Sequence, residues 1–452
     1  MTDAGMLAGR TDSASHALVF EGIPYAAPPV GNFRWRPPQP VAHWSGVRTA
    51  DHLSHNCMQA HPWGDIYPYA AGLSEDCLYL NVWTASTTGK RPVMVWIHGG
   101  GFIVGFGGEE RHRPAPLVQK GAVVVTLNYR LGAFGFLAHP ALAAESPHHV
   151  SGNYGMLDQI AALQWVKRNI AKFGGDPSRV TIFGESAGGM SVGVLVASPL
   201  AKGLFKRAIL ESGVGSGPAI QSVDSAQRAG IRLADTLGAT GSGAATVAKL
   251  RAVSAESLLA TSVRVAGGPG SPVHWPNIDG YLLRHTVDST LLLGQGNVVS
   301  VIAGSNSDEP QDRFGAPARA FARLLTARGA RAYIYQFTRA GEDSASRKRG
   351  AYHSAEITFV FGRPQPFEAS AGHASYDAAL ADAMSDYWVA FATSGNPNGA
   401  PAAGRWPVWP VYDRTTDAYM ELGPTVVAKR DLRRVQFDAY DVTARAAGEV
   451  RP

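Results

Sequence analysis

The sequence predicts an α/β fold, in which a central and mostly parallel β-sheet is flanked by helices on both faces. Residues 93–97 and 123–127 are short, continuous apolar runs, which are typical of strands buried on both faces of a sheet. Apolar residues then recur at three- and four-residue steps over residues 156–170, which predicts a helix, and another apolar run follows at residues 180–183. Strands that alternate with helices indicate a parallel sheet covered on both sides.

The other elements follow from the same patterns in chain order. The first 50 residues are rich in proline and glycine, which predicts irregular chain with short antiparallel strands. Small residues after residue 183 lead into a second helix that extends to Leu195. A long final helix is expected over residues 376–393. Further strands are expected at residues 208–210, 298–303 and 332–337.

The length and composition allow a large core. The chain has 452 residues, of which 45% are hydrophobic and 17% are charged. We expect one domain over residues 1–452, because α/β folds often exceed the usual domain length. The segment from about 219 to 270 is rich in Ala, Ser and Gly and has weak helical periodicity. We interpret it as an insertion at the rim of the sheet and not as a separate domain.

Several classes of partner have little support. The formal net charge is +5, and Lys and Arg are scattered apart from residues 347–349, so no nucleic-acid surface is predicted. No apolar run of about 18 residues or more occurs, and we expect no membrane span. We also expect no cofactor, because phosphate-binding and dinucleotide-binding motifs are absent. His52, His55 and His61 lie close together without the spacing of a metal motif, so no metal site is expected.

Two cysteines bear on the compartment. Cys57 and Cys77 are the only cysteines of the chain. A bridge between them would contribute roughly 3 kcal/mol by restricting the unfolded chain, and it would favour a secreted or periplasmic protein. Two free thiols would instead fit a cytoplasmic protein. The N-terminus has no basic region followed by an apolar one, so a secretory signal is either absent or was removed.

A G-x-S-x-G motif at residues 184–188 carries the strongest functional signal. It follows the strand predicted at residues 180–183 and opens a helix, which is the context of a nucleophile elbow. Gly184 and Gly188 let the strand and the helix approach each other, and the helix N-terminus beneath Ser186 favours developing negative charge. We therefore predict that Ser186 is a catalytic nucleophile.

A glycine-rich loop at residues 98–102 follows the strand predicted at residues 93–97. Glycines leave backbone N–H groups unshielded, so Gly100 and Gly101, together with the N–H of Ala187, can direct donors at an oxyanion. The alternative is a glycine-rich turn without a chemical role. The position of the loop ahead of the serine motif favours the oxyanion hole.

A serine nucleophile needs a base, and the base needs an acid that orients it. Among fourteen histidines, His353 lies late in the chain, between the strand predicted at residues 332–337 and the final helix. In this chain order the acid is expected between the serine and the histidine, after the strand predicted at residues 298–303. Asp308 and Glu309 both qualify there, and the spacing does not choose between them.

These motifs resemble the type-B carboxylesterase family, which also contains the cholinesterases. The resemblance covers nearly the whole chain and includes the loop at residues 98–102 and the motif at residues 184–188. The other matching runs are residues 20–26, 28–31, 74–82, 128–132, 153–155 and 157–159.

The resemblance implies an α/β-hydrolase fold and a full set of catalytic residues. Of the two acids Asp308 and Glu309, which are equivalent by chemistry, the resemblance selects Glu309. The resemblance assigns Ser186, Glu309 and His353 to a catalytic triad. It assigns Gly100, Gly101 and Ala187 to an oxyanion hole.

Other implied roles are structural. The resemblance implies that Cys57 and Cys77 are paired as a disulfide bond. Ser212 resembles a second serine near the active site, which has either a supporting role or no role beyond ending a strand. The family positions for buried ion pairs, for which a structural role is expected, are Arg34, Glu75, Arg130 and Asp158.

The chain departs from the family pattern around the acid. Pro310 stands where the family usually has glycine, and because proline fixes the backbone and removes an N–H, the loop of the acid is expected to differ. Only 44 positions separate Glu309 from His353, fewer than is typical. Residues 312–314 and 317–319 resemble the next family block, so a helical segment that normally helps wall the gorge is missing. We expect a shallower, more open site that accepts bulkier alcohols.

The predicted function is a serine carboxylesterase that hydrolyses a broad range of uncharged carboxylic esters through an acyl-enzyme, with a small-molecule ester as its substrate. One alternative is a catalytically silent relative that binds protein partners, although such proteins usually lack a triad residue. The same machinery acting on thioesters, amides or lipids is another, although no pronounced lipase lid is visible. Candidate substrate contacts are Trp83, Phe102, Ser212, Trp275 and residues 277–280.

Overall fold

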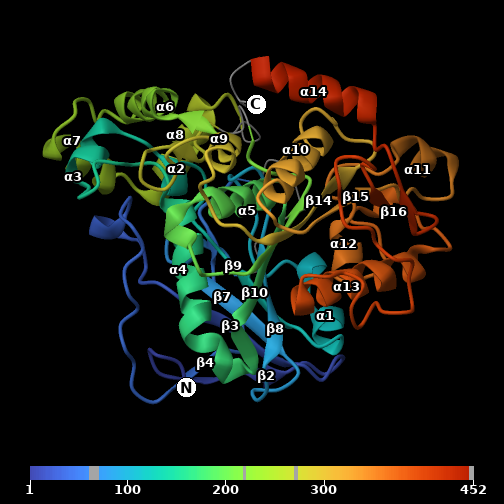
Figure 1. The fold of residues 1–452 in the computed structure, drawn as a ribbon. Coiled ribbons are helices and arrows are strands. Elements are labelled where there is room, and N and C mark those ends of the chain that lie inside the picture. Colours follow the sequence, from blue (N-terminus) through green and yellow to red (C-terminus); the bar gives the residue numbers. More distant parts are fainter. Residues whose placement is uncertain (61–70, 217–219, 269–272, 447–452) are drawn as a thin grey trace.

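Eleven strands form the central sheet in the computed structural model, which describes residues 1–60, 71–216, 220–268 and 273–446 (Figure 1). Within these residues, the strand order is β17-β16-β15-β14-β11-β10-β8-β9-β7-β3-β2. In chain order, the strands are β2 (Arg10–Thr11), β3 (Leu18–Pro24), β7 (Tyr79–Thr84), β8 (Arg91–Ile97), β9 (Val123–Leu127), β10 (Gly175–Glu185), β11 (Arg207–Glu211), β14 (Ser300–Asn306), β15 (Ala332–Phe337), β16 (Tyr419–Leu422) and β17 (Val427–Lys429).

The middle of the sheet, from β9 to β16, is parallel, and antiparallel strands complete it at both edges. Every residue of β9 is buried, as the continuous apolar run predicts. Alternate side chains of β8 enter two different cores, with Val95 in one and Trp96 in the other. The carboxyl ends of parallel strands lie along one edge of a sheet, so the segments after β8, β10 and β14 meet there.

Helices cover both faces of the sheet (Figure 1). The helices on one face share the first core and are α4 (Tyr154–Asn169), α5 (Ala187–Ala197), α9 (Val287–Leu292), α10 (Gly315–Thr326) and α14 (Arg434–Ala446). Those on the other face are α1 (Ala115–Gln119), α12 (Ile357–Val360) and α13 (Asp377–Ser394).

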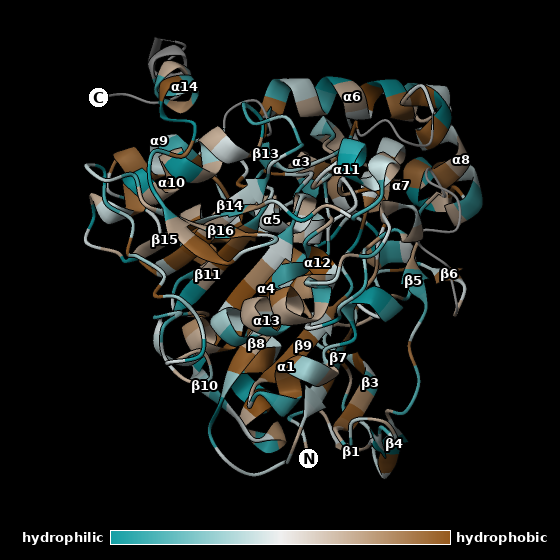
Figure 2. Ribbon diagram, turned by 90° about the vertical axis from the view of Figure 1, so that its right-hand side faces the viewer, coloured by the Kyte–Doolittle hydropathy of each residue, from teal (hydrophilic) through white to brown (hydrophobic). Residues whose placement is uncertain are grey.

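A third core lies at the rim of the sheet. It joins Phe134, Leu233, Leu250 and Leu258 from four helices. Figure 2 shows α6, α7 and α8 gathered along one side of the molecule. The rim helices are α2 (Gly132–Phe136), α3 (Pro140–Glu145), α6 (Val223–Thr236), α7 (Ala244–Ala252) and α8 (Ala255–Val265). The last three lie in the segment interpreted as an insertion, whose end residues 219, 269 and 270 are outside the described residues.

Short elements complete the described chain. They are β1 (Met6–Ala8), β4 (Val47–Thr49), β5 (Asn56–Cys57), β6 (Leu73–Ser74), β12 (Gln221–Ser222), β13 (Asn277–Ile278) and α11 (Ser344–Arg349). No helix in the described ranges is both long and apolar enough to cross a membrane.

The predicted fold class is confirmed. The strands predicted at residues 93–97, 123–127 and 332–337 coincide with or lie within β8, β9 and β15. The strand predicted from residue 298 begins instead at Ser300, because Val298 is 48% exposed and lies before the sheet. An apolar residue at the start of a run does not by itself mark the point where pairing begins.

The implied disulfide and ion pairs are also present. Cys57 and Cys77 are bonded, and this bond links β5 to the segment before β7. Arg34 Nε donates to Glu75 over 2.7 Å, and Arg130 binds both oxygens of Asp158 over 2.6 and 2.7 Å. All four charged side chains are largely buried.

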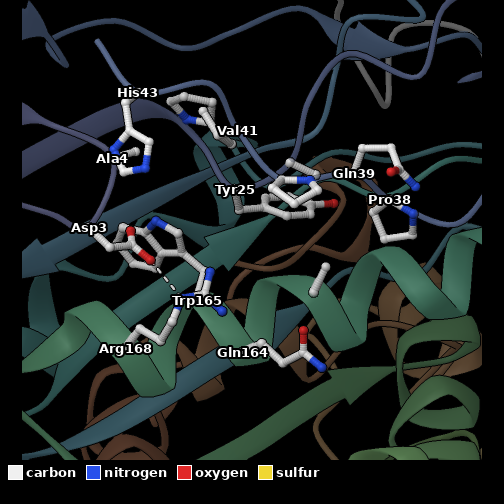
Figure 3. A pocket seen from close by; sticks show the side chains of 14 residues that line it. Asp3, Ala4, Tyr25, Pro38, Gln39, Val41, His43, Gln164, Trp165 and Arg168 are labelled. Atoms are coloured by element: carbon white, nitrogen blue, oxygen red, sulfur yellow. Dashed lines mark hydrogen bonds and ion pairs between the residues drawn. The ribbon is translucent and has the colours of Figure 1, made fainter. Parts of the chain in front are cut away.

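A cavity of about 340 Å³ lies between the N-terminal segment and the C-terminal half of α4 (Figure 3). Its wall includes Tyr25, Pro38 and Trp165, and the ion pair of Asp3 with Arg168 (2.6 Å) closes one side. No predicted site residue lines this cavity. It is therefore separate from the site at the carboxyl ends of the strands.

Candidate active site

Ser186 occupies the sharp turn between β10 and α5. Its backbone has φ 55° and ψ −119°, which residues with a side chain rarely adopt. The turn is possible because its neighbours are glycines: a Cβ on Gly188 would lie 2.0 Å from Ile97 O, and one on Gly184 would lie 2.6 Å from it. The Ser186 N–H donates to Glu211 O over 2.8 Å and fixes the turn to the sheet.

His353 lies between Ser186 and Glu309. Its Nε2 is 2.9 Å from Ser186 Oγ, and its Nδ1 is 2.8 Å from Glu309 Oε2. Because a carboxylate only accepts, the proton of the neutral ring lies on Nδ1, and Nε2 can accept from the serine hydroxyl. The Glu309 side chain is 1% exposed, whereas that of His353 is 37% exposed and reachable from solvent.

The loop after β14 presents both acids, but they face different partners. The Asn306 N–H donates to Glu309 Oε1 over 3.0 Å, which leaves Oε2 directed at His353. Asp308 instead accepts from the Ala351 N–H over 2.9 Å. The structure thus places the second acid beside the histidine and the first against the backbone of the histidine loop.

The residues that follow Glu309 form part of the surroundings of His353. Pro310 offers no N–H, and the Gln311 side chain closes the loop by donating to Asn306 O over 2.6 Å. Phe314 follows at the start of α10 and stacks on the imidazole of His353, with ring centroids 4.7 Å apart and planes 25° apart. Phe314 is 6% exposed, so its ring covers one face of the histidine.

Three backbone N–H groups near Ser186 are available to a ligand. Gly100 and Gly101 have φ 94° and 63°, a region that favours glycine, and Ala187 is the first residue of α5. Across the described residues, these three N–H groups donate to no other atom. An oxyanion hole requires backbone N–H groups that have no other acceptor. Binding of an oxyanion by these three groups remains a prediction.

Two buried carboxyl groups lie beside the histidine. Glu185 Oε1 is 3.3 Å from His353 Nε2. Glu356 accepts from the Ser212 hydroxyl over 3.1 Å and from Asn306 Nδ2 over 2.6 Å. Burial raises the pKa of Glu185 to about 7 and that of Glu356 to about 8.

The charge state of His353 depends on these groups. Burial alone favours the neutral ring and lowers the pKa of His353. The negative charges of Glu185 and Glu309 outweigh burial and raise that pKa to about 9. A base works only when neutral, so activity should rise as the pH increases through the pKa of His353.

Replacing Glu185 with glutamine should move the acid limb of the pH profile. The change Glu185→Gln removes a charge 3.3 Å from His353 Nε2, so the pKa of His353 falls. The midpoint of the acid limb of the kcat/KM profile should therefore move to a pH lower by about 1 unit. The measurement is kcat/KM for a neutral ester from pH 5 to 10. Glu421→Gln, far from the site in an exposed pair with Lys429, should leave the profile unchanged. A limb that stays in place or moves to higher pH contradicts the expectation.

The predicted substrate contacts occupy different settings. Trp83 and Phe102 are 3% and 0% exposed and lie in the core, and Phe102 has φ 60°. Ser212 is fully buried beneath Glu356. Trp275 is half-buried, and its Nε1 has no partner among the described residues. Residues 277–280 form β13 and the turn after it. Contact with a substrate stays a prediction for all of them.

Two of the three histidines considered for metal binding, His52 and His55, lie within the described residues. His52 pairs with its neighbour Asp51 on the surface, with 2.7 Å between Nδ1 and Oδ1. His61 lies outside the described residues. In the described ranges, no three His, Cys, Asp or Glu side chains are placed to hold a metal ion.

Three neighbours of the triad were not predicted from the sequence. Glu185 is the variable residue before the serine in the G-x-S-x-G motif, Glu356 follows His353 by three positions, and Phe314 follows Glu309 by five. Only Glu185 had a local signal, because a residue beside the nucleophile on a tight turn must lie near the reacting atoms.

The arrangement is suited to nucleophilic acyl transfer. A hydroxyl is within hydrogen-bonding distance of an imidazole, the imidazole is oriented by a buried carboxylate, and free N–H donors lie on the adjacent loop and helix.

Comparison with known proteins agrees with this chemistry. The model of the carboxylesterase family matches residues 1–312 and 310–440. The two matches meet just after Glu309, which is where the chain is expected to lack a segment. The fumonisin B1 esterase of Sphingopyxis macrogoltabida is 36% identical over 454 positions, covering 87% of this chain and 81% of that protein.

Other relatives come from distant organisms. The para-nitrobenzyl esterase of Bacillus subtilis (strain 168) is 34% identical over 487 positions, covering 95% of this chain and 96% of that protein. Carboxylesterase 1D of Rattus norvegicus is 33% identical over 527 positions, covering 96% of this chain and 91% of that protein. Because this chain has 452 residues, the rat protein contains segments that this chain lacks.

Proposed function

The chain belongs to the carboxylesterase family and is a carboxylic ester hydrolase, and we propose that it cleaves uncharged esters through an acyl-enzyme on Ser186. The observation that carries this proposal is the continuous hydrogen-bonded series from Ser186 through His353 to Glu309, with distances of 2.9 and 2.8 Å. The roles of the individual residues follow from the chemistry that such a series performs.

In the proposed mechanism, Ser186 Oγ attacks the ester carbonyl while His353 Nε2 takes its proton. Glu309 stabilises the imidazolium that forms, and it keeps the ring in the productive tautomer. The N–H groups of the oxyanion hole receive the negative charge of the tetrahedral intermediate. His353 then protonates the departing alcohol. A water molecule, activated by the same base, hydrolyses the acyl-enzyme and frees Ser186.

The first test is hydrolysis of p-nitrophenyl esters with acyl chains from acetate to palmitate. Fast turnover of short chains is expected, together with labelling of Ser186 at one adduct per chain by a fluorophosphonate, read by mass spectrometry of the tryptic peptide. Absence of turnover by well-folded protein would contradict the proposal. The partner-binding alternative would then be favoured. Comparison with a thioester and an anilide of the same acyl group separates the esterase from the alternatives that share its machinery.

We also propose that the site is shallow and open, so that it admits bulky alcohol groups. Two observations support this: the short connection from Glu309 to α10, and the 37% exposure of the His353 side chain. Rates with esters of one acid and alcohols of increasing size test it. A steep loss of kcat/KM with larger alcohols, or a crystal structure with a deep closed gorge, would contradict it.

The central sheet and the disulfide bond bear on domain organisation and compartment. We propose that residues 1–452 act as a single catalytic domain with the segment at about 219–270 on its rim, since strands from Arg10 to Lys429 belong to one central sheet. The disulfide between Cys57 and Cys77 favours a secreted or periplasmic location.

A further inference from the structure

The loop that carries Gly100 and Gly101 has little structure of its own. This segment, residues 98–107, is here called the oxyanion loop, and it lies between β8 and the chain leading to α1. Its internal backbone bonds are those of Ile103 N and Val104 N to Gly100 O, over 3.0 and 3.1 Å. Its position must therefore be set by groups outside it.

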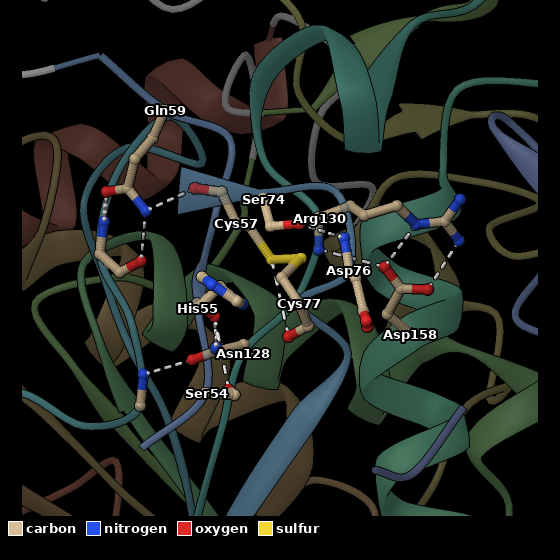
Figure 4. The surroundings of a disulfide bond; sticks show 12 residues. Ser54, His55, Cys57, Gln59, Ser74, Asp76, Cys77, Asn128, Arg130 and Asp158 are labelled. Atoms are coloured by element: carbon tan, nitrogen blue, oxygen red, sulfur yellow. Dashed lines mark hydrogen bonds and ion pairs between the residues drawn. A yellow bond between two sulfur atoms is a disulfide. The ribbon is translucent and has the colours of Figure 1, made fainter. Parts of the chain in front are cut away.

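Gln59 provides one such group through a single side chain. Its Oε1 accepts from the Gly105 N–H over 2.9 Å, and its Nε2 donates to Gly105 O over 3.0 Å (Figure 4). The same Nε2 donates to Cys57 O over 3.0 Å. Gln59 is 1% exposed, so these bonds are shielded from water. One amide thus binds both backbone groups of Gly105, as a neighbouring strand would.

Gly105 is close to the first residue of the oxyanion loop. A Cβ at Gly105 would lie 2.4 Å from His98 Nδ1, and Gly105 has φ 108°. The His98 ring donates from Nδ1 to Gly99 O over 2.9 Å and stacks on Tyr129. A displacement of Gly105 would therefore press on the residues that precede Gly100.

A second side chain ties the loop to the same segment. Asn128 Oδ1 accepts from the Gly107 N–H over 2.8 Å, and Asn128 Nδ2 donates to His55 O over 3.1 Å (Figure 4). His55 and Gln59 flank Cys57, which β5 and the disulfide hold against the body of the protein. The oxyanion loop is thus fastened to the segment at residues 55–59.

We propose that Gln59 is a positioning residue for the oxyanion hole, acting through the backbone of Gly105. This inference rests on the proposed esterase function. Oxyanion donors stabilise the transition state only when they are fixed before the reaction, so a loosened loop lowers kcat more than it weakens substrate binding. Gln59 itself touches no reacting atom.

The test is a comparison of Gln59→Leu with the wild-type protein. We expect kcat to fall about 10- to 100-fold, below the loss from removing a whole donor, while KM changes by about 3-fold or less. Inhibition by a trifluoromethyl ketone that forms a hemiketal with the serine should weaken by the same factor as kcat/KM. Active-site titration corrects each rate for the folded fraction.

Two further variants keep the test decisive. Gln59→Glu retains the size of the side chain but places a carboxylate against the carbonyl oxygens of Gly105 and Cys57, so it should also lose activity even if the leucine variant folds poorly. Gln159→Leu is the matched control, because Gln159 is fully buried on α4 and donates to Ser191. It should retain wild-type kcat per titrated site.

The outcomes separate the two proposals. Wild-type turnover with unchanged kcat in both Gln59 variants would overturn the positioning role alone. So would a rise in KM with unchanged affinity for the ketone. An inactive wild-type protein would overturn the esterase function, and the positioning role with it.

Discussion

Replacement of Ser186 with alanine should lower kcat for a p-nitrophenyl ester by about 10⁶-fold, to a residual rate set by the oxyanion donors and substrate binding. The reason is geometric: Ser186 Oγ, the proposed nucleophile, lies 2.9 Å from His353 Nε2. KM should change little, because the hydroxyl contributes mainly to the transition state.

The measurement is steady-state hydrolysis with Ser191→Ala as a control. Ser191 lies one turn further along α5, is fully buried and accepts from Gln159, so its loss tests folding of the helix without touching the chemistry. We expect near wild-type kcat for the control. Retention of more than about one-hundredth of the wild-type rate by the Ser186 variant would reject Ser186 as the nucleophile.

Loss of Arg130 should have the largest effect on stability. Arg130→Met leaves the carboxylate of Asp158, which is fully buried, without its bidentate partner, and we expect the free energy of unfolding to fall by about 3–5 kcal/mol. Equilibrium urea unfolding, followed by tryptophan fluorescence, measures the change.

Two comparisons make the stability prediction specific. Arg168→Met breaks an ion pair with Asp3 whose side chains are 52% and 40% exposed, and it should cost about 1 kcal/mol or less. The double change Arg130→Met with Asp158→Leu removes both charges and should recover much of the loss. A double variant as unstable as Arg130→Met would show that the cost lies in packing and not in an unpaired charge.

The buried carboxyl groups give the site a dependence on pH that a simple triad lacks. Glu185 Oε1 lies 3.3 Å from His353 Nε2, and burial raises the pKa of Glu185 to about 7. Glu185 is therefore charged at the higher pH at which His353, whose pKa is raised to about 9, loses its proton, and its charge opposes that loss. The acid limb of the activity profile belongs to this group of residues and not to the histidine alone.

The sequence by itself determined the fold class and was sufficient to propose Ser186 as the nucleophile. Continuous apolar runs specified strands buried on both faces, because a strand covered on both sides has no polar position. The glycines of residues 184–188 marked a turn that only small residues allow, which located Ser186 without knowledge of the rest of the chain. Each of these features is local, so its signal lies within a few consecutive residues.

The tertiary structure decided what depends on pairs of distant residues. Asp308 and Glu309 are equivalent by chemistry, and they differ in the structure because the Asn306 N–H directs Glu309 towards His353. The stacking of Phe314 on His353 and the bonds of Gln59 to Gly105 leave no pattern in the sequence, because they join segments 39 and 46 positions apart. Local sequence determines the conformation of a segment, whereas contacts between segments depend on how the whole sheet and its helices pack.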